Sequence, residues 1–593
     1  MSFRLNPIVL NDDGSLVNTQ MSFFSSYSVL SDRYKRDLQK GWAGLFRTLI
    51  MPYIDENPYR VLYSERPCRS NVPVNVLMGA QILKLMKSIP NDDDLREKAC
   101  YDLEFRYALC CENYEGAPFS DNVLTRFRRA CILHYIDTGE DLIHETFDSL
   151  KDQFVKLMEI DPTLFSIDST MIDTWAKDMN RLELLYVNNE LMIRAITGVV
   201  TRKREPKTTT VKHNLDMIDG QLKFASAPDE SIGNEQLQAF RKEREIEIQR
   251  AKALLPEQLH RYLDISDKNI ITYHSEAPYR DRLNAVTGDS SVLLSFCEEH
   301  TEYQAEPYYQ TFIRILKEQC KEDGSGTYTV RGSGDGMDSG IVQNPHDPDA
   351  TYREKDGEKY KGYVTGFTQS KNADGETLVM DYNIEKNNIS DQELGTALLM
   401  NHAIPDPETR TQCVGDSLFN SDAMQQVATK KNIEIINTNL TGKTPPDHCA
   451  DHQFDDGGNL TMCAGGVTPE STKLNKDGSC TAKFNKEDCV SCPYSEQCRK
   501  TEQVKYNSLK TSTKVKDRAE QIRSRNTDEF KELANFRNGV ETIPSFLKNK
   551  YHAEEDRAFG LAAKKLSVGF MYIAINVTKV VQFAQRRVES ALN

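Results

Sequence analysis

The hydrophobic pattern of the first 160 residues is typical of packed amphipathic helices. Pro73 suits the first turn of a helix, and the apolar residues after it recur on one helical face through Met86. The Asn-Asp-Asp-Asp cluster at 91–94 favours a second helix start, because such side chains are suited to helix N-termini. A third helix is expected over 101–111. We therefore predict that residues 1–160 form a helical N-terminal domain.

A further helix is predicted after Ser120 or Asp121, either of which can cap it. Its apolar residues Val123, Phe127 and Cys131 share one face. The basic residues on its other face are Arg126, Arg128 and Arg129. Two interpretations are open. The basic face is a solvated rim of the bundle, or the helix contacts DNA phosphates or a groove, and the domain is then DNA-binding.

The pattern changes to alternating strands and helices after residue 160. Residues 164–167 form a short strand-like run that ends on Asp168, and a helical pattern follows over 171–199. Helical spacing returns between about 236 and 320, with a dense charge run that fits a solvated face. We expect a helical insert at about 215–322.

A hairpin and a strand–helix–strand unit follow this insert. Two strand-like runs, 360–369 and 376–384, are joined by a turn that contains Asp374-Gly375. Residues 411–415 then form a strand that leads into Asp416, followed by a helix over 421–431 and a strand over 433–436. These elements predict an α/β fold in which helices cover a mixed sheet.

Composition and charge narrow the class of protein. The chain has 593 residues, enough for several domains, and its net charge of −15 excludes a uniformly basic nucleic-acid coat but not local basic faces. The N-terminus lacks the apolar run of a signal peptide. The apolar stretch 566–583 is interrupted by Asn576 and Lys579, which is too polar for a membrane span. We expect a cytoplasmic protein with no membrane partner.

Three acids stand out by their placement. Asp168 and Asp416 each follow a predicted strand, and Glu541 lies on a predicted helix over 528–541. Two-metal phosphodiester cleavage needs hard oxygen ligands that converge from different elements of a rigid scaffold. Ribonuclease H-like nucleases assemble their sites in this way, so these acids are the candidate metal ligands.

The segments around these acids resemble the DDE transposases of bacterial insertion sequences, members of the ribonuclease H-like and retroviral-integrase superfamily. Residues 167–170 resemble the region of the first catalytic acid, and 415–417 that of the second. Residues 537–541, with Lys548 beyond them, match the R-x3-E-x6-K signature. The Tyr of that signature is replaced by Ala534. Residues 67–129 resemble the helical N-terminal domain of these enzymes.

The resemblance implies a ribonuclease H-like mixed sheet flanked by helices, with a helical N-terminal domain and a Cys-rich insertion. We place the discontinuous core at 161–440 and 525–593 and the Cys-rich, basic insertion at 441–524. Asp168, Asp416 and Glu541 would hold two Mg²⁺ ions, for which Mn²⁺ can substitute. One ion activates water and later the freed 3′-hydroxyl, and the other stabilises the leaving oxygen.

The spacing of residues in the R-x3-E-x6-K motif, from Arg537 to Lys548, also has a physical explanation. Arg537 and Glu541 are four residues apart and share a helical face, so the Glu can bind a metal while the Arg holds the neighbouring phosphate. The alternative is a plain surface ion pair. Lys548 would lie on the same face of a continuous helix, but Pro544 predicts a kink or an end to that helix.

Other acids have simpler explanations. Asp335 and Asp338 lie in a Gly-rich loop and are typical turn residues. Asp422 begins a helix and is explained by capping. For Asp347 and Asp349, within the sequence Asn-Pro-His-Asp-Pro-Asp, a substrate-facing role and a structural role both stay open.

Six of the 14 cysteines gather between residues 449 and 498. Cys489 and Cys492 have the C-x2-C spacing of a zinc knuckle. We interpret the island as a structural Zn²⁺ site with Cys489, Cys492 and Cys498 as ligands. The fourth ligand is open among Cys480, our first choice, and two others, Cys463 and Cys449. The alternative is a set of reduced thiols in a small irregular insert.

A basic stretch follows the cysteines and precedes the catalytic helix. Its later members are Lys514, Lys516, Arg518, Arg523 and Arg525. Together with Arg537 and Lys548 they are candidates for contact with a phosphate backbone. The alternative is an exposed connector.

The sequence therefore predicts a DNA transposase of the bacterial cytoplasm, associated with the nucleoid when bound. It would cleave at transposon ends and transfer the strands into target DNA. Its expected partners are double-stranded DNA, as terminal inverted repeats and target, and, by resemblance, a second copy of the chain in a homodimer. The alternatives are a nuclease of the same fold without strand transfer and a non-catalytic DNA-binding derivative.

Overall fold

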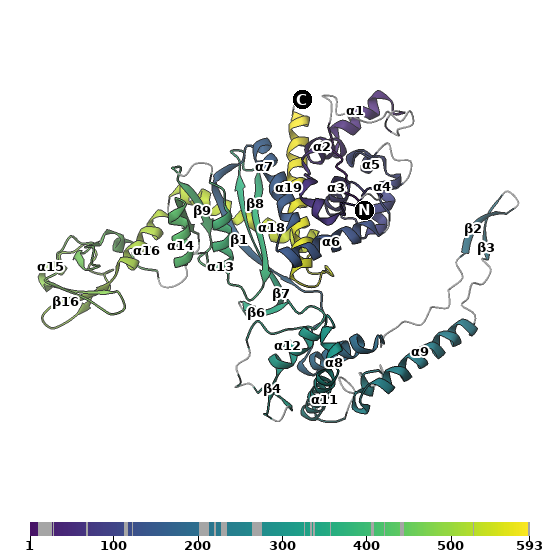
Figure 1. Cartoon of the computed structure of the whole chain (residues 1–593). Coiled ribbons are helices and arrows are strands. Elements are labelled where there is room, and N and C mark those ends of the chain that lie inside the picture. Colours follow the sequence, from purple (N-terminus) through teal and green to yellow (C-terminus); the bar gives the residue numbers. More distant parts are fainter. Residues whose placement is uncertain are drawn as a thin grey trace.

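The computed structural model describes most of the chain, and its N-terminal part is helical (Figure 1). The residues outside the description are 10–26, 28, 67–68, 112–116, 121, 201–212, 219–220, 227–233, 264–275, 325–326, 333–334, 336–337, 356, 405–407, 420, 439–443, 526 and 591–593. The N-terminal helices are α1 (Asp32–Lys40), α2 (Trp42–Leu49), α3 (Val74–Met86), α4 (Asp92–Tyr101), α5 (Leu103–Ala108), α6 (Val123–Thr138) and α7 (Leu142–Met158).

Two of these helices begin where the sequence predicts, and a third begins slightly later. The α3 helix follows Pro73 and is almost entirely buried, and Asn91 caps α4 by accepting a hydrogen bond from the Asp94 backbone N–H at 2.8 Å. The α6 helix starts at Val123, but its N-cap is Asn122, whose side chain makes no capping bond. Ser120 instead contributes its carbonyl, which accepts from the Val123 N–H. Asp121 lies outside the described residues.

The core of the molecule is a six-stranded mixed sheet, which confirms the predicted α/β class. Its strands are β1 (Asp161–Asp173), β6 (Thr351–Lys355), β7 (Glu358–Lys371), β8 (Thr377–Lys386), β9 (Thr411–Gly415) and β10 (Ile433–Asn437). The order is β10-β9-β1-β7-β6, with β8 also paired to β7. Strands β1, β7 and β8 are antiparallel neighbours, whereas β9 and β10 run parallel to β1.

Strand β1 is longer than its sequence indicates. It pairs with β7 as far as Asp173 opposite Gly362, so Asp168 lies in the middle of the strand and not at its end. The helix expected over 171–199 therefore starts later, as α8 (Arg181–Thr197), where Asn180 and Glu183 form a reciprocal capping box. Antiparallel pairing over the whole of β7 supplies the backbone partners that local propensity could not reveal.

Helices cover both faces of the sheet. On one face, α13 (Asp391–Asn401) and α14 (Asp422–Lys430) pack against Phe165 and Ile167 of β1. On the other face lie α7 and the long C-terminal helix α19 (Leu561–Ser590), which contacts β8 and also helices α2, α3 and α6 (Figure 1). The C-terminal helix thus joins the N-terminal helices to the sheet.

One helix of the described chain, α19, is long and apolar enough to cross a membrane, but 78% of its apolar window is buried inside the protein. Its polar residues have partners there. Asn576 donates to the Val379 carbonyl at 2.8 Å and accepts from the Val379 N–H at 2.9 Å, beside a bulge in β8. Buried polar groups that are satisfied in this way are characteristic of a protein core, so α19 is a core helix.

Two insertions extend from the sheet in different directions (Figure 1). The first holds α8, α9 (Asn234–Leu254), α11 (Tyr279–Glu299) and α12 (Tyr309–Gln319), around a hydrophobic cluster of their own. It also holds two hairpins, β2–β3 (His213–Ile218, Gln221–Ser226) and β4–β5 (Cys320–Glu322, Tyr328–Val330).

The second insertion is mostly short strands. They are β11 (Gln453–Phe454), β12 (Leu460–Met462), β13 (Ser471–Leu474), β14 (Cys480–Phe484), β15 (Thr501–Glu502) and β16 (Asn507–Thr511). Its helices are a short η6 (Asp447–Asp451), α15 (Lys486–Val490) and α16 (Thr513–Ser524), and α16 packs against η6. The chain then returns to the sheet through α17 (Asp528–Asn538).

Candidate active site

Asp168 lies on the face of β1 that is turned away from α13. Its neighbour Ile167 packs into the cluster under α13 and α14, and the Ser169 hydroxyl donates to Asp391 of α13 at 2.9 Å. Because side chains alternate along a strand, Asp168 points to the opposite face, where α17 crosses β1 and β9. Its side chain is only 9% exposed, and one carboxylate oxygen accepts from the Ser169 N–H at 2.8 Å.

Asp416 directly follows β9, the neighbour of β1. The parallel register pairs Ser166 with Val414, and Asp168 and Asp416 each come two residues later, so they occupy equivalent positions on adjacent strands. The Asp416 carboxylate accepts from the Leu418 N–H at 2.8 Å, which turns the chain away from the sheet.

Arg537 and Glu541 complete the group of charges. Arg537 stands in the last turn of α17, and Glu541 ends the following 3₁₀ turn η7 (Gly539–Glu541). The Arg537 Nη1 lies 3.2 Å from Glu541 Oε1, and its Nη2 lies 3.4 Å from Asp168 Oδ2. The arginine side chain is 13% exposed and that of Glu541 62%, so one guanidinium joins a buried carboxylate to a solvent-facing one.

The electrostatics of Asp168 reflect this arrangement. Burial raises the pKa of its carboxyl to about 6, Arg537 opposes the rise, and the negative charges of Glu541 and Asp416 add to it. The other two acids therefore act on Asp168 through space. A buried carboxylate with an elevated pKa, beside other acids, is a common feature of functional sites.

Comparison with known protein families covers two separate parts of the chain. The profile of a family described as transposase DDE domain matches residues 462–581, and that of a family described as transposase domain (DUF772) matches residues 39–130. Together these two matches indicate a DDE transposase of an insertion sequence. Searches among curated proteins and among solved structures gave no significant match.

The two matched regions account for different parts of the transposase. The first includes Arg537, Glu541 and most of α19, and the second spans α2 to the middle of α6. Asp168 and Asp416 lie outside both matches, so their assignment rests on the geometry described above. The match to a transposase DDE domain implies an enzyme that acts on DNA, in a class that typically uses divalent metal ions.

Among the described residues, no three His, Cys, Asp or Glu side chains form a ready-made metal site. At the acids, Arg537 lies between two of the carboxylates. Its guanidinium bonds to both Asp168 and Glu541, so a cation of the chain itself separates these carboxylates.

Lys548 of the transposase is not beside the acids. The regular helix ends at Asn538, before Pro544, and the chain continues through α18 (Thr542–Ser545) and a π-helical turn (Phe546–Lys550). The Lys548 Nζ pairs with Glu554 at 2.8 Å. Both charges act on Asp173, at the far end of β1, and not on Asp168.

Asp347 and Asp349 have structural partners. Asp347 is fully buried and accepts from the Thr174 hydroxyl at 2.6 Å, the Tyr363 hydroxyl and the Gly560 N–H. Asp349 pairs with Lys386 at 2.7 Å and accepts from the Leu561 N–H at 3.1 Å. Both aspartates thus fix the start of α19, which favours the structural role of the two left open by the sequence.

The basic residues of α6 differ in their surroundings. Arg128 forms an ion pair with Asp92 of α4 at 2.6 Å, and its Nη1 also bonds to that carboxylate. Arg126 and Arg129 are exposed, and Arg126 lines a wide groove of about 870 Å³ together with Arg4 and Arg69. Arg128 thus has a partner within the domain, whereas its neighbours remain available to a ligand.

The basic stretch around α16 is partly committed to internal contacts. Arg523 lies 2.8 Å from Asp451 and 3.3 Å from Asp447 of η6. Arg525 donates to the Asn437 carbonyl at 3.1 Å, and Lys516 lies 3.6 Å from Glu520. Lys514 is exposed, and Arg518 is half-buried. Arg523 and Arg525 thus anchor α16 to its surroundings, and their contact with DNA stays a prediction.

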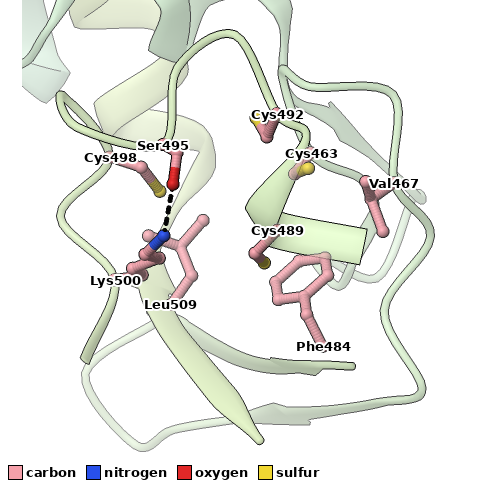
Figure 2. Close-up of a pocket in the computed structure, with 9 residues that line it drawn as sticks. All are labelled: Cys463, Val467, Phe484, Cys489, Cys492, Ser495, Cys498, Lys500 and Leu509. Carbon is pink, nitrogen blue, oxygen red and sulfur yellow. Dashed lines mark hydrogen bonds between the residues drawn. The ribbon is translucent and has the colours of Figure 1, made fainter. Parts of the chain in front are cut away.

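The cysteines gather differently from the predicted set. Cys489, Cys492 and Cys498 line one small cavity, and the fourth cysteine there is Cys463 (Figure 2). Cys480 is buried in β14, where its Sγ accepts from the Leu460 N–H at 3.4 Å. The strand alternation that turns Cys480 into the sheet core could not be inferred from Cys spacing alone.

Proposed function

We propose that this transposase cleaves DNA at the ends of its element and transfers the strands to a target, with Asp168, Asp416 and Glu541 as its catalytic acids. The observation that carries the proposal is the Arg537 bridge. The Arg537 guanidinium contacts both the buried Asp168 of β1 and Glu541. Asp416 follows the adjacent strand β9 at the position equivalent to Asp168.

The sheet supports a ribonuclease H-like interpretation of the core. Asp168 comes from the central strand β1, Asp416 from the adjacent parallel strand β9, and Glu541 from a helical segment late in the chain. Convergence of acids from separate elements of a rigid scaffold is what a phosphoryl-transfer site requires.

The donor set fits hard divalent cations. All three candidates present carboxylate oxygens, the ligands that Mg²⁺ prefers, and Mn²⁺ accepts the same set. Burial raises the pKa of Asp168, and the negative charges of Glu541 and Asp416 raise it further. Divalent cations would offset this repulsion. Two such ions, when bound, supply Lewis acidity to the attacking and leaving oxygens of the phosphodiester.

The side chains of the chain itself have defined tasks in this proposal. Asp168 and Asp416 hold fixed positions because the strands that carry them are paired on both sides. Glu541 is exposed, so it can move toward the other acids. Arg537, released from the carboxylates, offers a forked pair of N–H donors to the phosphate beside the scissile bond.

Substitution of the acids tests the proposal. Asp168→Asn and Glu541→Gln should each reduce Mg²⁺-dependent nicking of terminal-repeat DNA by at least about 1,000-fold, because transition-state charge stabilisation is lost. DNA-end binding, measured by gel shift, should stay within about twofold, since the backbone and the basic residues are unchanged. Glu532→Gln, on the exposed face of α17, is the matched control and should cut normally.

Persistent cleavage by either variant would contradict the catalytic assignment. An assay for joined products separates the proposed transposase from a nuclease without strand transfer. A wild-type protein that binds ends but neither nicks nor joins them would be a non-catalytic derivative. Pairing of two ends requires two active sites, so we also propose a homodimer on DNA, to be measured by light scattering of the complex.

A further inference from the structure

Four cysteines of the second insertion surround one enclosed space. Cys463, Cys489, Cys492 and Cys498 line a cavity of about 30 Å³, large enough for a single small species. The other lining residues are Val467, Phe484, Ser495, Lys500 and Leu509. Figure 2 shows the four side chains around this space, contributed by separate turns of the chain. All four are free thiols.

The turn that carries Cys463 packs closely against Cys492. The Cys463 N–H donates to the Val467 carbonyl at 3.0 Å, and the Gly466 N–H donates to the Cys463 carbonyl at 2.9 Å. Gly466 has φ +78°, which glycine adopts without strain. A Cβ at Gly465 would lie 2.5 Å from the Cys492 Sγ and 3.8 Å from the Cys463 Sγ. Only glycine therefore lets the turn approach both sulfurs.

The other three cysteines belong to one compact segment. Cys489 lies in α15, and two residues separate it from Cys492, which is the usual gap of a metal knuckle. The Ser495 N–H donates to the Cys492 carbonyl at 3.0 Å, and the Cys498 N–H donates to the Tyr494 carbonyl at 2.8 Å. These turns bring Cys498 back to the cavity that Cys489 and Cys492 line.

We propose that Cys463, Cys489, Cys492 and Cys498 bind one structural zinc ion. Four thiolates around Zn²⁺ form the tetrahedral arrangement typical of structural sites, with Zn–S distances of about 2.3 Å. The described residues hold no cluster already at such distances. Binding would thus draw the sulfurs inward from the cavity wall, as happens where metal binding and folding are coupled.

Lys500 fits the charge of such a site. A zinc tetrathiolate carries net negative charge, and the Lys500 side chain lines the same cavity, held by a 2.7 Å bond to the Ser495 hydroxyl. The Lys500 backbone N–H also bonds to Cys498. Donors around the thiolates are the second shell that orients and stabilises metal ligands.

The small core of the insertion supplies a reason for the metal. Its buried apolar cluster consists of five residues: Leu460, Cys480, Ala482, Phe484 and Leu509. Strand β13 is exposed along its whole length. Small units with so little buried apolar surface usually need a disulfide or a metal. A zinc ion here would fasten the turn at Cys463 to the segment 489–498 and so rigidify the insertion.

The remaining candidates in the insertion are engaged elsewhere. Cys480 accepts a backbone bond inside the sheet, and Cys449 packs with Ala450 and Ala519 between η6 and α16. His452 Nδ1 accepts from the Ala464 N–H at 2.9 Å, and the His448 ring stacks on Tyr494. These contacts assign the fourth position to Cys463.

Metal analysis of the full-length protein tests the site. Purified wild type should contain about one zinc per chain. Cys463→Ser should weaken zinc binding by at least about 100-fold in competition with a chromophoric chelator, since loss of a ligand exceeds the usual effect of a second-shell change. Cys480→Ala, the matched control, should keep wild-type zinc content.

Cobalt spectroscopy provides a readout that does not depend on a variant's yield. Co²⁺-loaded wild type should show the charge-transfer and ligand-field bands of a tetrahedral tetrathiolate. Cys463→His should still bind Co²⁺, with bands shifted toward an S₃N set. Wild type without zinc or Co²⁺ binding, or loss of zinc from Cys480→Ala but not from Cys463→Ser, would overturn the proposal. Mg²⁺-dependent cleavage is scored separately, so the two proposals fail independently.

Discussion

The ionisation of Asp168, a proposed catalytic acid, links the stability of the protein to pH. Its carboxyl is buried beside two other acids, and Arg537 and the Ser169 N–H offset the charge only in part. Groups placed for catalysis often lower stability in this way, because the fold must hold them in an unfavourable environment. The loss of folding stability occurs only when the Asp168 carboxyl is ionised, so its size depends on pH.

Asp168→Asn should therefore stabilise the metal-free protein at neutral and alkaline pH. The folded-state pKa of about 6 lies above the unfolded value near 3.8, so the wild type loses stability as pH rises between them. The variant's advantage should grow over this window to at most about 3 kcal/mol and vanish below it. Chemical denaturation from pH 3 to pH 8 with chelator present measures it. Asp178→Asn, at an exposed position, should show no such trend.

The acids show how far single residues can be placed from the sequence. The i,i+4 spacing of Arg537 and Glu541 predicted a shared helical face, and the structure places their side chains in contact. The contact of Arg537 with Asp168 spans 369 positions and has no local signal. The sequence likewise could not single out Cys463 from the other candidates for the fourth zinc ligand. Its position depends on the turn at Gly465, which packs closely against Cys492.

At the scale of elements, local signals identified starts and turns better than lengths. Ser421 caps α14 and Gly375 turns the β7–β8 hairpin with φ +82°, both by interactions within a few residues. Strand β1 was underestimated because its second half is stabilised by pairing with β7, about 190 residues away. Long-range pairing is decided by the fold and not by propensity.

The packing of α19 on β8 depends on the Asn576 side chain, which takes the place of a neighbouring strand as hydrogen-bond partner. Asn576 satisfies both backbone groups of Val379, where the bulge interrupts regular pairing, and Gly569 lies against the Tyr382 hydroxyl at a position where a Cβ would come within 2.7 Å. The helix therefore packs closely on β8 in one register. It also carries the link between the N-terminal helices and the sheet.

Asn576→Ala should destabilise the protein by about 2–5 kcal/mol, because it leaves a buried N–H and a buried carbonyl without partners. Urea denaturation monitored by far-UV circular dichroism measures the change. Gln582→Ala, at an exposed position of the same helix, should stay within about 0.5 kcal/mol of wild type. Equal stability of the two variants would show that Asn576 does not fix the helix to β8.

For the whole molecule, the balance of charge limits where DNA can bind. The net charge of −15 means that the protein as a whole repels a polyanion, so affinity must come from local basic surfaces. Many of the arginines in the basic stretches are bound internally: Arg128 to Asp92, Arg523 to η6 and Arg525 to the end of β10. The exposed Arg126 and Arg129 of α6 are among the charges still available to phosphates.

The salt dependence of DNA binding distinguishes these two kinds of arginine. Each phosphate contact contributes about 0.9 to the slope of log Kobs against log salt on duplex DNA. The double variant Arg126→Gln, Arg129→Gln should therefore flatten the slope by about 2, measured by fluorescence anisotropy on terminal-repeat DNA. Arg128→Gln should leave the slope unchanged and lower stability instead, because it breaks the ion pair with Asp92. A flatter slope for Arg128→Gln alone would mean that α4 releases this residue to DNA and that α6 docks by rearrangement.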